Sequence, residues 1–236
     1  MQRENEWGQP IGPELPGWKA PPEPSRRVLE GSYCRLEPLD VEVHGRSLFL
    51  ANAEAKDARA WTYLPYGPFD TLESYRAWLR DSCLGDDPLF FAIVERESRA
   101  AAGVAAYLRI APSAGSVEVG HLNFSPRISQ SRAATEAMAL MMKYAFELGY
   151  RRYEWKCDSL NAPSRAAALR LGFVFEGIFR NAVVYKGRSR DTAWFSVTDA
   201  EWPALARAHA TWLEPTNFDE HGTQRTRLSE LTRVAR

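Results

Sequence analysis

The chain has 236 residues, which is long enough for one domain with a well-buried core. Its 30 lysine and arginine residues balance its 30 aspartate and glutamate residues, so the formal net charge is zero. This balance disfavours a nucleic-acid partner, because binding to a phosphate backbone normally requires a basic excess or a basic stripe. Hydrophobic residues make up 45% of the chain, a fraction typical of folded proteins and too high for a disordered one.

The cysteines and the apolar runs exclude further classes of protein. Cys34, Cys83 and Cys157 are odd in number, lie far apart and have no histidine nearby, so we expect reduced thiols and no metal site. No apolar run approaches the roughly 20 residues needed to span a bilayer, and the first residues lack the apolar core of a signal peptide. We therefore expect a cytoplasmic protein without a membrane partner.

The chain divides into three sections by composition. Residues 1–25 are rich in proline and predict an extended arm, whose apolar side chains, among them Trp7 and Trp18, should lie across the surface of the domain. Residues 26–214 carry the hydrophobic patterns of one folded domain. Residues 215–236 are polar, so we expect a loose tail.

Hydrophobic periodicity predicts a mixed order of strands and helices within the domain. Asp40 is placed to cap one helix and Asp70 or Thr71 the next, while Gly149 and Gly172 are placed to end later helices. A mixed sheet covered by helices on both faces satisfies this order. The predicted elements are a strand at 31–39, helices over 41–53 and 72–79, strands at 89–94, 103–110 and 117–124, a long helix over 131–148, a strand over 150–158, a short helix over 163–171, strands over 173–180 and 183–197, and a helix over 199–213.

Together with this element order, the segments 118–126, 134–137, 161–164 and 171–173 resemble the GNAT superfamily of N-acetyltransferases, and most closely its Rim-type ribosomal-protein N-acetyltransferases. The resemblance covers about residues 27–197. It implies the GNAT fold, an α/β (α+β) fold with a mixed, mostly antiparallel central sheet of about six to seven strands and helices on both faces. It also implies acetyl-CoA as co-substrate and an amine as acceptor.

The start of the long helix is the candidate phosphate site. Its first amides lack helical partners, and with the helix dipole they favour an anion, which by the resemblance is the pyrophosphate of CoA. The family loop usually reads Gln/Arg-x-x-Gly-x-Gly/Ala, but here Ser129 takes the first position and Arg132 that of the central glycine, so the arginine must swing clear or join as a donor. The alternative is simply the polar start of an amphipathic helix. The candidate CoA-binding residues of this loop are Gln130, Ser131, Arg132, Ala133, Ala134 and Thr135.

The strand before this loop is the second candidate CoA contact. In the family it splays from its neighbour and its exposed backbone pairs with the pantetheine arm, and Leu122, Asn123 and Phe124 occupy that place. Their side chains remain ordinary sheet residues under either interpretation, because the expected contact is made by the backbone.

Glu118 is the candidate general base, because an attacking amine must lose a proton and a carboxylate in the cleft can accept it, directly or through one water. Alternation along the strand places Glu118 on one face with Gly120, Leu122 and Phe124, where burial would raise its pKa. Some GNAT members carry a glutamate base at this position. The alternative is a structural ion pair with an arginine such as Arg109 on the adjacent strand.

Asn161 and Ser164 stand where Rim-type enzymes place an asparagine that binds CoA and a serine near its sulfur. Ser164 is therefore the candidate donor to the departing thiolate. Many GNATs use a tyrosine four residues before the glycine of the Gly-Phe pair, but Ala168 stands there, which excludes that chemistry. The alternative makes Asn161 the cap and Ser164 a first-turn residue of the short helix.

Three other features could belong to the functional site or have a purely structural role. His121 is expected on the strand face opposite Glu118 and lacks a partner at triad or metal-ligand spacing, so a structural role is favoured. The turn at 186–191 is rich in donors that could bind an anion, but charged turns are usually solvated. Four aromatic residues between 61 and 69 would shape an acceptor pocket, or pack in the core.

The sequence thus predicts an N-acetyltransferase that passes the acetyl group of acetyl-CoA to a primary amine by direct attack in a ternary complex. The acceptor is the N-terminus of a protein or peptide, or a small-molecule amine, and a homodimer is compatible with the sequence. The alternative, from another class, is a degenerate GNAT that binds acyl-CoA without turnover as a sensor or interaction module.

Overall fold

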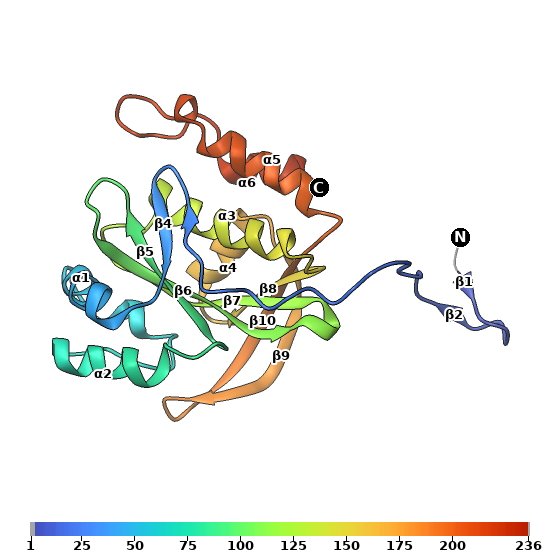
Figure 1. Ribbon diagram of the computed structural model, residues 1–236, viewed down its shortest axis with the longest axis horizontal. Helices are drawn as coiled ribbons and strands as arrows, with labels where there is room; N and C mark the ends of the chain where they lie inside the picture. The colour runs from blue at the N-terminus through green and yellow to red at the C-terminus, as the bar shows by residue number, and fades with distance from the viewer. Residues whose placement is uncertain (1–2, 236) are drawn as a thin grey trace.

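The computed structural model describes residues 3–235 and contains an eight-stranded sheet flanked by helices and a separate two-stranded sheet (Figure 1). The helices are α1 (Val41–Ala53), α2 (Leu72–Ser82), α3 (Arg132–Glu147), α4 (Ala162–Arg170), α5 (Trp202–Leu213) and α6 (Leu228–Val234). The strands are β1 (Arg3–Glu4), β2 (Pro10–Ile11), β3 (Leu29–Glu30), β4 (Cys34–Pro38), β5 (Leu89–Glu95), β6 (Ala101–Ala111), β7 (Ser116–Phe124), β8 (Arg152–Asp158), β9 (Val174–Tyr185) and β10 (Arg188–Thr198).

The central sheet has eight strands in the order β3-β4-β5-β6-β7-β8-β10-β9. All of its neighbours run antiparallel except β7 and β8, which are parallel. The expected mixed, mostly antiparallel fold with helices on both faces is therefore confirmed. The sheet is wider than the expected six to seven strands because the two-residue β3 adds to one edge. None of the helices within residues 3–235 is both long and apolar enough to cross a membrane.

Local sequence signals fix the ends of the helices. The carboxylate of Asp40 accepts hydrogen bonds from two first-turn amides of α1, and Thr71 forms a reciprocal capping box with Ser74 at the start of α2. Gly149 and Gly172 follow the two helices that flank the site and have φ values of 99° and 97°. Glycine adopts this left-handed conformation without strain, so both helices end where the sequence predicts.

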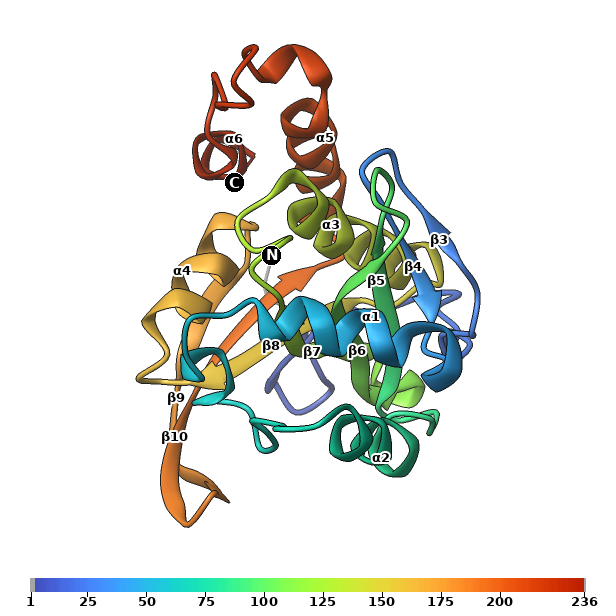
Figure 2. The ribbon, with the colours of Figure 1, turned by 90° about the vertical axis from the view of Figure 1, so that its left-hand side faces the viewer.

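Two apolar cores lie on opposite faces of the sheet. Helices α1 and α2 cover one face, where Leu48, Tyr75 and Phe90 are buried. Helices α3, α4, α5 and α6 cover the other, where Met141 and Phe195 are buried, and Figure 2 shows α5 and α6 stacked outside α3. Strands β5 and β6 are apolar along most of their length because both of their faces are covered.

Strands β7 and β8 separate part-way along their length. They pair only from Ser116 to Val119 on β7 and from Arg152 to Trp155 on β8, and both strands continue beyond that point. Strand β7 is also bulged against β6 near His121, whose φ is 52°. This separation leaves one edge of each strand without a sheet neighbour in the middle of the domain.

A buried carboxylate ties α3 to the start of the sheet. Glu136 is 5% exposed and accepts backbone hydrogen bonds from Ser32, Tyr33 and Cys34 at 2.7, 2.7 and 2.8 Å. A Cβ atom on Gly31 would lie 2.4 Å from the same carboxylate, so only glycine permits this close approach. Three charge-assisted bonds therefore fix α3 against the chain that enters the sheet.

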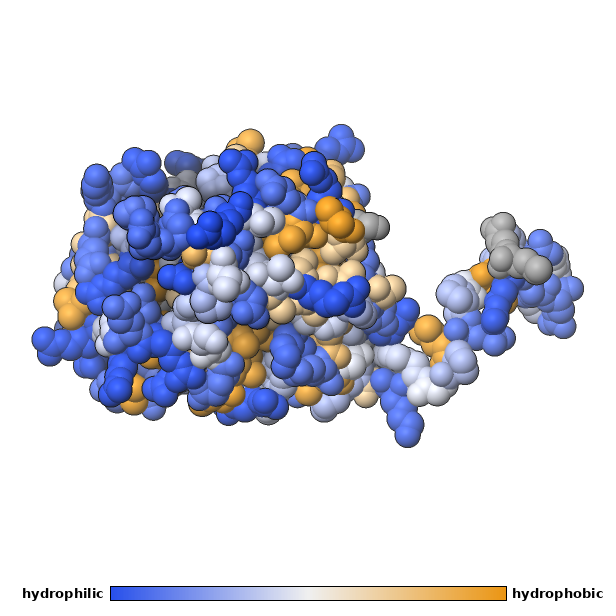
Figure 3. Space-filling view, turned by 90° about the horizontal axis from the view of Figure 1, so that it is seen from above, coloured by the Kyte–Doolittle hydropathy of each residue, from blue (hydrophilic) through white to orange (hydrophobic). Residues whose placement is uncertain are grey.

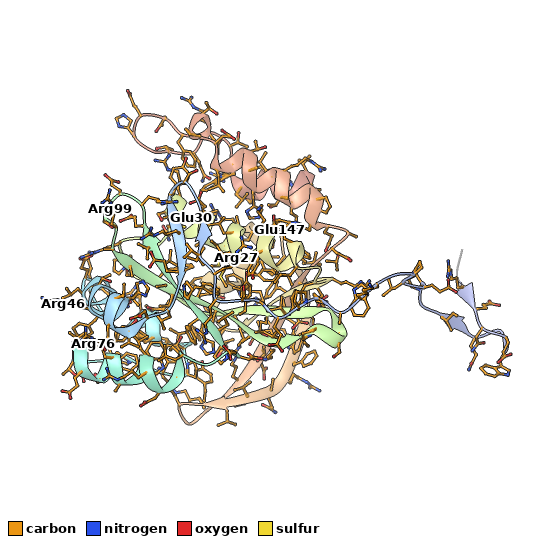
Figure 4. The ribbon with its side chains drawn as sticks, viewed as in Figure 1. Arg27, Glu30, Arg46, Arg76, Arg99 and Glu147 are labelled. Carbon is orange, nitrogen blue, oxygen red and sulfur yellow. The ribbon has the colours of Figure 1, made fainter. Side chains whose placement is uncertain are left out.

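The N-terminal arm departs from the prediction. Its outer part, including the β1–β2 pair, projects away from the domain instead of lying across it, and Trp7 is 75% exposed (Figures 1 and 3). The two short strands satisfy each other's backbone groups, so this part needs no bonds from the domain. The inner part does lie against the domain, with Trp18 beside Gly115. The amide of Ser25 donates to the Tyr144 hydroxyl, and the Arg27 guanidinium lies over the Tyr144 ring. Figure 4 labels Arg27 at this end of the arm.

The C-terminal tail also differs from the expected loose segment. Leu228 on α6 is fully buried, and the Thr232 hydroxyl donates to the backbone carbonyl of Arg170 at the end of α4. A short amphipathic helix in an otherwise polar sequence is enough to fold the tail back onto the domain, because it covers apolar surface on α5.

We predict that Glu136→Ala lowers the free energy of unfolding by about 3 kcal/mol, because three buried amides lose a charged acceptor. Chemical denaturation measures the change. Glu147→Ala is the matched control on the same helix, since Glu147 is exposed and pairs only with Lys143, one turn away; its cost should stay below about 0.5 kcal/mol. Equal costs for the two variants would contradict the role given to Glu136.

Candidate functional site

A cavity of about 960 Å³ opens between the start of α3, the exposed face of α4 and the chain after α5. Six of the expected CoA-binding residues line it: Phe124, Gln130, Ser131, Arg132, Ala134 and Thr135. Ala133 does not line it, because its side chain faces the core. The cavity thus contains the predicted phosphate loop.

The loop presents unpaired backbone donors to this cavity. The amides of Gln130, Arg132 and Ala133 donate to no group among residues 3–235, while the Ser131 hydroxyl accepts from the amide of Ala134. Gln130 has a φ of 60°, so the chain turns here in a conformation that usually requires glycine. Three unpaired amides at a helix start form a site for an anion.

Arg132 swings clear of the amides, one of the two arrangements that the sequence allowed. Its guanidinium lies 4.8 Å from the centre of the Tyr33 ring and 4.6 Å from that of Phe218. The side chain therefore stays at the edge of the cavity, stacked between two aromatic rings, and leaves the first turn of α3 open.

Arg170 is a second cation of this cavity, and sequence reasoning missed it. Its guanidinium donates to the Thr135 hydroxyl at 3.2 Å and lies 4.9 Å from the Trp212 ring. Among the described residues no carboxylate lies within ion-pair distance of it, and burial lowers the pKa of Arg170. A partly buried cation without a counter-charge favours an anionic ligand. The sequence offered one clue to Arg170: it directly precedes the Leu171-Gly-Phe segment, which is part of the resemblance to the family.

A second cavity of about 530 Å³ meets the first at the separated strands. The two share Phe124 and Ser129, and the second is lined by α1 and the loop after it, including Lys56, Arg59 and Trp61. Trp155 lines the first cavity from β8. The two cavities therefore adjoin at Phe124, in the part of β7 that no longer pairs with β8, one beside the anion site and one at the end of α1.

The bulge in β7 corrects two predictions about strand faces. Glu118 and Gly120 lie opposite Leu108 and Ala106 of β6, on the side of α1 and α2, whereas Leu122 and Phe124 pack against the core on the α3 side. The extra residue at the bulge reverses the alternation. Glu118 therefore does not share a face with Leu122 and Phe124.

For the same reason His121 lies on the same side of the sheet as Glu118, and not opposite it. Its ring centroid is 5.7 Å from that of Tyr66 and 5.1 Å from that of Phe90, within the aromatic cluster under α2. Burial, with a smaller contribution from Arg109, lowers the pKa of His121 to about 4, so its ring is neutral near pH 7. A packed neutral ring agrees with the structural role that the sequence favoured.

Glu118 lies at the point where the strands separate. It is 3% exposed, and its carboxylate is 2.9 Å from the Lys156 ammonium and 3.5 Å from the Arg109 guanidinium. Lys156 also pairs with Glu154 at 2.7 Å. Burial raises the pKa of Glu118, against the lowering effect of the two cations. The anticipated pair with Arg109 is present, while Lys156 was missed because its partner is on a strand distant in sequence.

Asn123 and Leu122 do not line either cavity with their side chains. The side chain of Asn123 is buried on the α1 side, and within residues 3–235 its amide group has no hydrogen-bond partner. The backbone from Leu122 to Phe124 borders the gap that faces β8, which is where the family places the pantetheine arm.

Asn161 and Ser164 form the start of α4. The Asn161 side-chain oxygen accepts from the amide of Ser164 at 3.1 Å, so Asn161 is the helix cap, and neither residue lines the cavity. The indole of Trp155 donates to the Ser164 hydroxyl oxygen at 3.0 Å. Because the oxygen accepts this bond, the hydroxyl proton of Ser164 points elsewhere, and the Cys157 sulfur is one acceptor within its reach.

A hydrogen bond joins the donor-rich turn at 186–191 to the aromatic loop at 61–69. Lys186, in the β9–β10 turn, donates to the backbone carbonyl of Trp61 at 2.8 Å. Trp61 is buried, and its ring meets Phe69 edge-on at 5.5 Å. The loop therefore packs in the core and also walls the second cavity. Residues 3–235 contain no cluster of side chains suited to a metal ion.

Residues 35–174, more than half of the chain, match the family model of the acetyltransferase (GNAT) domain. The chain belongs to the GNAT acetyltransferase family. Like its relatives it is an acetyltransferase, and the family implies acetyl-CoA as the acetyl donor.

Solved structures agree with this assignment. A GCN5-related N-acetyltransferase from Brucella melitensis is 49% identical, with a TM-score of 0.90 over 93% of this chain and 100% of the other. A probable GNAT-family acetyltransferase from Chromobacterium violaceum is 43% identical, with a TM-score of 0.77 over 83% of this chain and 98% of the other. A candidate ribosomal-protein-serine acetyltransferase from Vibrio cholerae shares the fold at 19% identity, with a TM-score of 0.63 over 73% of this chain and 97% of the other. No curated protein matches the chain in sequence.

We predict that inorganic pyrophosphate raises the midpoint of thermal unfolding of the wild-type protein, because it binds the native anion site and not the unfolded chain. Arg170→Gln should lose most of this rise. Arg165→Gln is the matched control on the same helix, since Arg165 donates to the Ser159 carbonyl and does not line the cavity. An equal rise in all three proteins, measured by differential scanning fluorimetry, would show that the anion binds elsewhere.

Proposed function

We propose that this GNAT enzyme transfers the acetyl group of acetyl-CoA to a primary amine by direct attack in a ternary complex. The observation that carries the proposal is that the cavity at the start of α3 adjoins a second chamber at Phe124, where β7 has separated from β8. A thioester with its phosphates at α3 reaches the gap from one side, and an amine reaches it from the other. No covalent enzyme intermediate is needed when both substrates meet at one point.

The second chamber favours a small-molecule amine as acceptor. It holds about 530 Å³, and its charged lining is mixed, with Lys56, Asp57 and Arg59 side by side. A protein or peptide N-terminus, which carries a positive charge, would be better matched by a wide acidic groove. A peptide acceptor is therefore the second candidate, supported by the resemblance to the Rim-type enzymes.

Glu118 takes the role of general base. It lies one residue before the last paired rung, on the side of the sheet that α1 and α2 cover, and its raised pKa suits proton transfer. Because Glu118 does not line either cavity, the proton passes from the amine through one water. Lys156 and Arg109 then hold the carboxylate in place and balance its charge when it is ionised.

Ser164 takes the role of proton donor to the departing thiolate. Trp155 orients its hydroxyl from the cavity wall, and the pantetheine arm lies along the backbone of residues 122–124. Asn161 supports this arrangement by fixing the first turn of α4. Removal of the Ser164 hydroxyl should therefore lower kcat.

The rival function is a binding module without turnover, for which the substituted phosphate loop is the motivating feature. Calorimetry with acetyl-CoA, together with a thiol-release assay over peptides and small amines, separates the two. Binding and thiol release with a small amine support the proposal. Binding without thiol release from any amine supports the module.

We predict that Glu118→Gln lowers kcat/KM about a hundredfold and removes the acidic limb of its pH profile. In the wild-type enzyme the base must be ionised, so kcat/KM should fall as the pH drops through the Glu118 pKa, which burial raises above 4.5. Acetyl-CoA affinity should be kept.

Glu154→Gln is the matched control for this variant. Glu154 lies directly opposite Glu118 on β8 and shares Lys156 with it, so its replacement disturbs the same ion pair without removing the base. The control should retain the acidic limb. If Glu118→Gln keeps both the rate and the limb, Glu118 is not the base.

A further inference from the structure

The segment from Pro215 to Arg227 forms the outer wall of the larger cavity. Phe218, Gly222, Thr223 and Gln224 line the cavity opposite α3 and α4, together with Trp212 at the end of α5. This wall lies beyond residues 35–174, which the family model matches. It is the part of the chain that the sequence predicted to be loose.

Hydrogen bonds within the segment give the wall a defined shape. Phe218 and Gln224 form a β-bridge that closes a short loop, and the Asn217 side chain bonds the backbone of Trp212 and Thr226. The Trp212 indole donates to the Gln224 side chain at 2.8 Å. The wall is therefore a built surface and not a flexible tail end.

Two cations connect this wall to the anion site. Arg132 stacks on Phe218 and Arg170 lies over Trp212, and the structure places no carboxylate within ion-pair distance of either guanidinium among residues 3–235. Guanidinium groups on aromatic rings bind both phosphate groups and flat bases, by charge and by stacking. The wall therefore matches a ligand that carries both.

The position of the wall indicates which end of acetyl-CoA would contact it. The thioester end must reach the gap at Phe124 and Trp155, and the pyrophosphate is held at the start of α3, so the remaining end projects toward the segment from Pro215 to Arg227. We infer that this segment binds the adenosine 3′-phosphate end of acetyl-CoA and makes the enzyme select full-length CoA over thioesters without a nucleotide. The inference rests on the proposed function.

The test compares acetyl-CoA with acetyl-pantetheine, which lacks the nucleotide. Phe218→Ala should lower the preference for acetyl-CoA, measured as the ratio of the two kcat/KM values, about tenfold, because Arg132 loses one stacking partner at the wall. His221→Ala is the matched control in the same loop, since its side chain is exposed and does not line the cavity, and it should keep the ratio. An unchanged ratio in Phe218→Ala would overturn the inference.

A measurement on the wild-type protein covers the case in which Phe218→Ala fails to fold. Adenosine 3′,5′-bisphosphate should slow hydrogen exchange at the amides of residues 217–226. Slowing only at the start of α3 would overturn the inference and leave acetyl-CoA binding intact. If acetyl-CoA itself neither binds to nor reacts with the wild-type enzyme, the proposed function fails, and the inference fails with it.

Discussion

The separation of β7 and β8 is the constraint on which the site depends. Beyond Val119 and Trp155 each strand keeps a single sheet neighbour, β6 for one and β10 for the other. Backbone groups in the interior of a domain need hydrogen-bond partners, so such a gap is stable only where a ligand or water can enter. The bulge at His121 lies in this unpaired part of β7 and determines which of its side chains face each side of the sheet.

The helix that carries the anion site is held in place from outside the site. Glu136 fixes α3 to the chain entering the sheet, one turn after the residues whose amides are unpaired. Arg132, one turn earlier, is held by Tyr33 and Phe218. The segment that enters the sheet and the segment that follows α5 thus meet at one guanidinium, and together they keep the amides of the phosphate loop exposed.

The charges of the site are arranged in two groups with different tasks. Arg132 and Arg170 lack carboxylate partners among the described residues and so form the positive end, beside the unpaired amides of α3. Glu118 and Lys156 form a buried pair at the other end, near the strand gap. An unpaired cation favours an anionic ligand, whereas a buried carboxylate with a raised pKa suits the base role proposed for Glu118, so the two proposed roles lie at separate places.

The sequence by itself determined the elements, their order and the family. Asp40, Thr71, Gly149 and Gly172 act through bonds or conformations within a few residues, so local reasoning placed the helix ends correctly. It also predicted the phosphate loop, which the structure places at the larger cavity with unpaired amides. Tertiary structure alone decided which side chains of β7 lie on which face of the sheet. One extra residue in a bulge moves every later side chain to the opposite face, and the hydrophobic pattern does not reveal the bulge. Tertiary structure likewise decided the partners of Glu118 and Arg170 and the wall formed by the C-terminal segment, since those contacts join positions far apart in the chain.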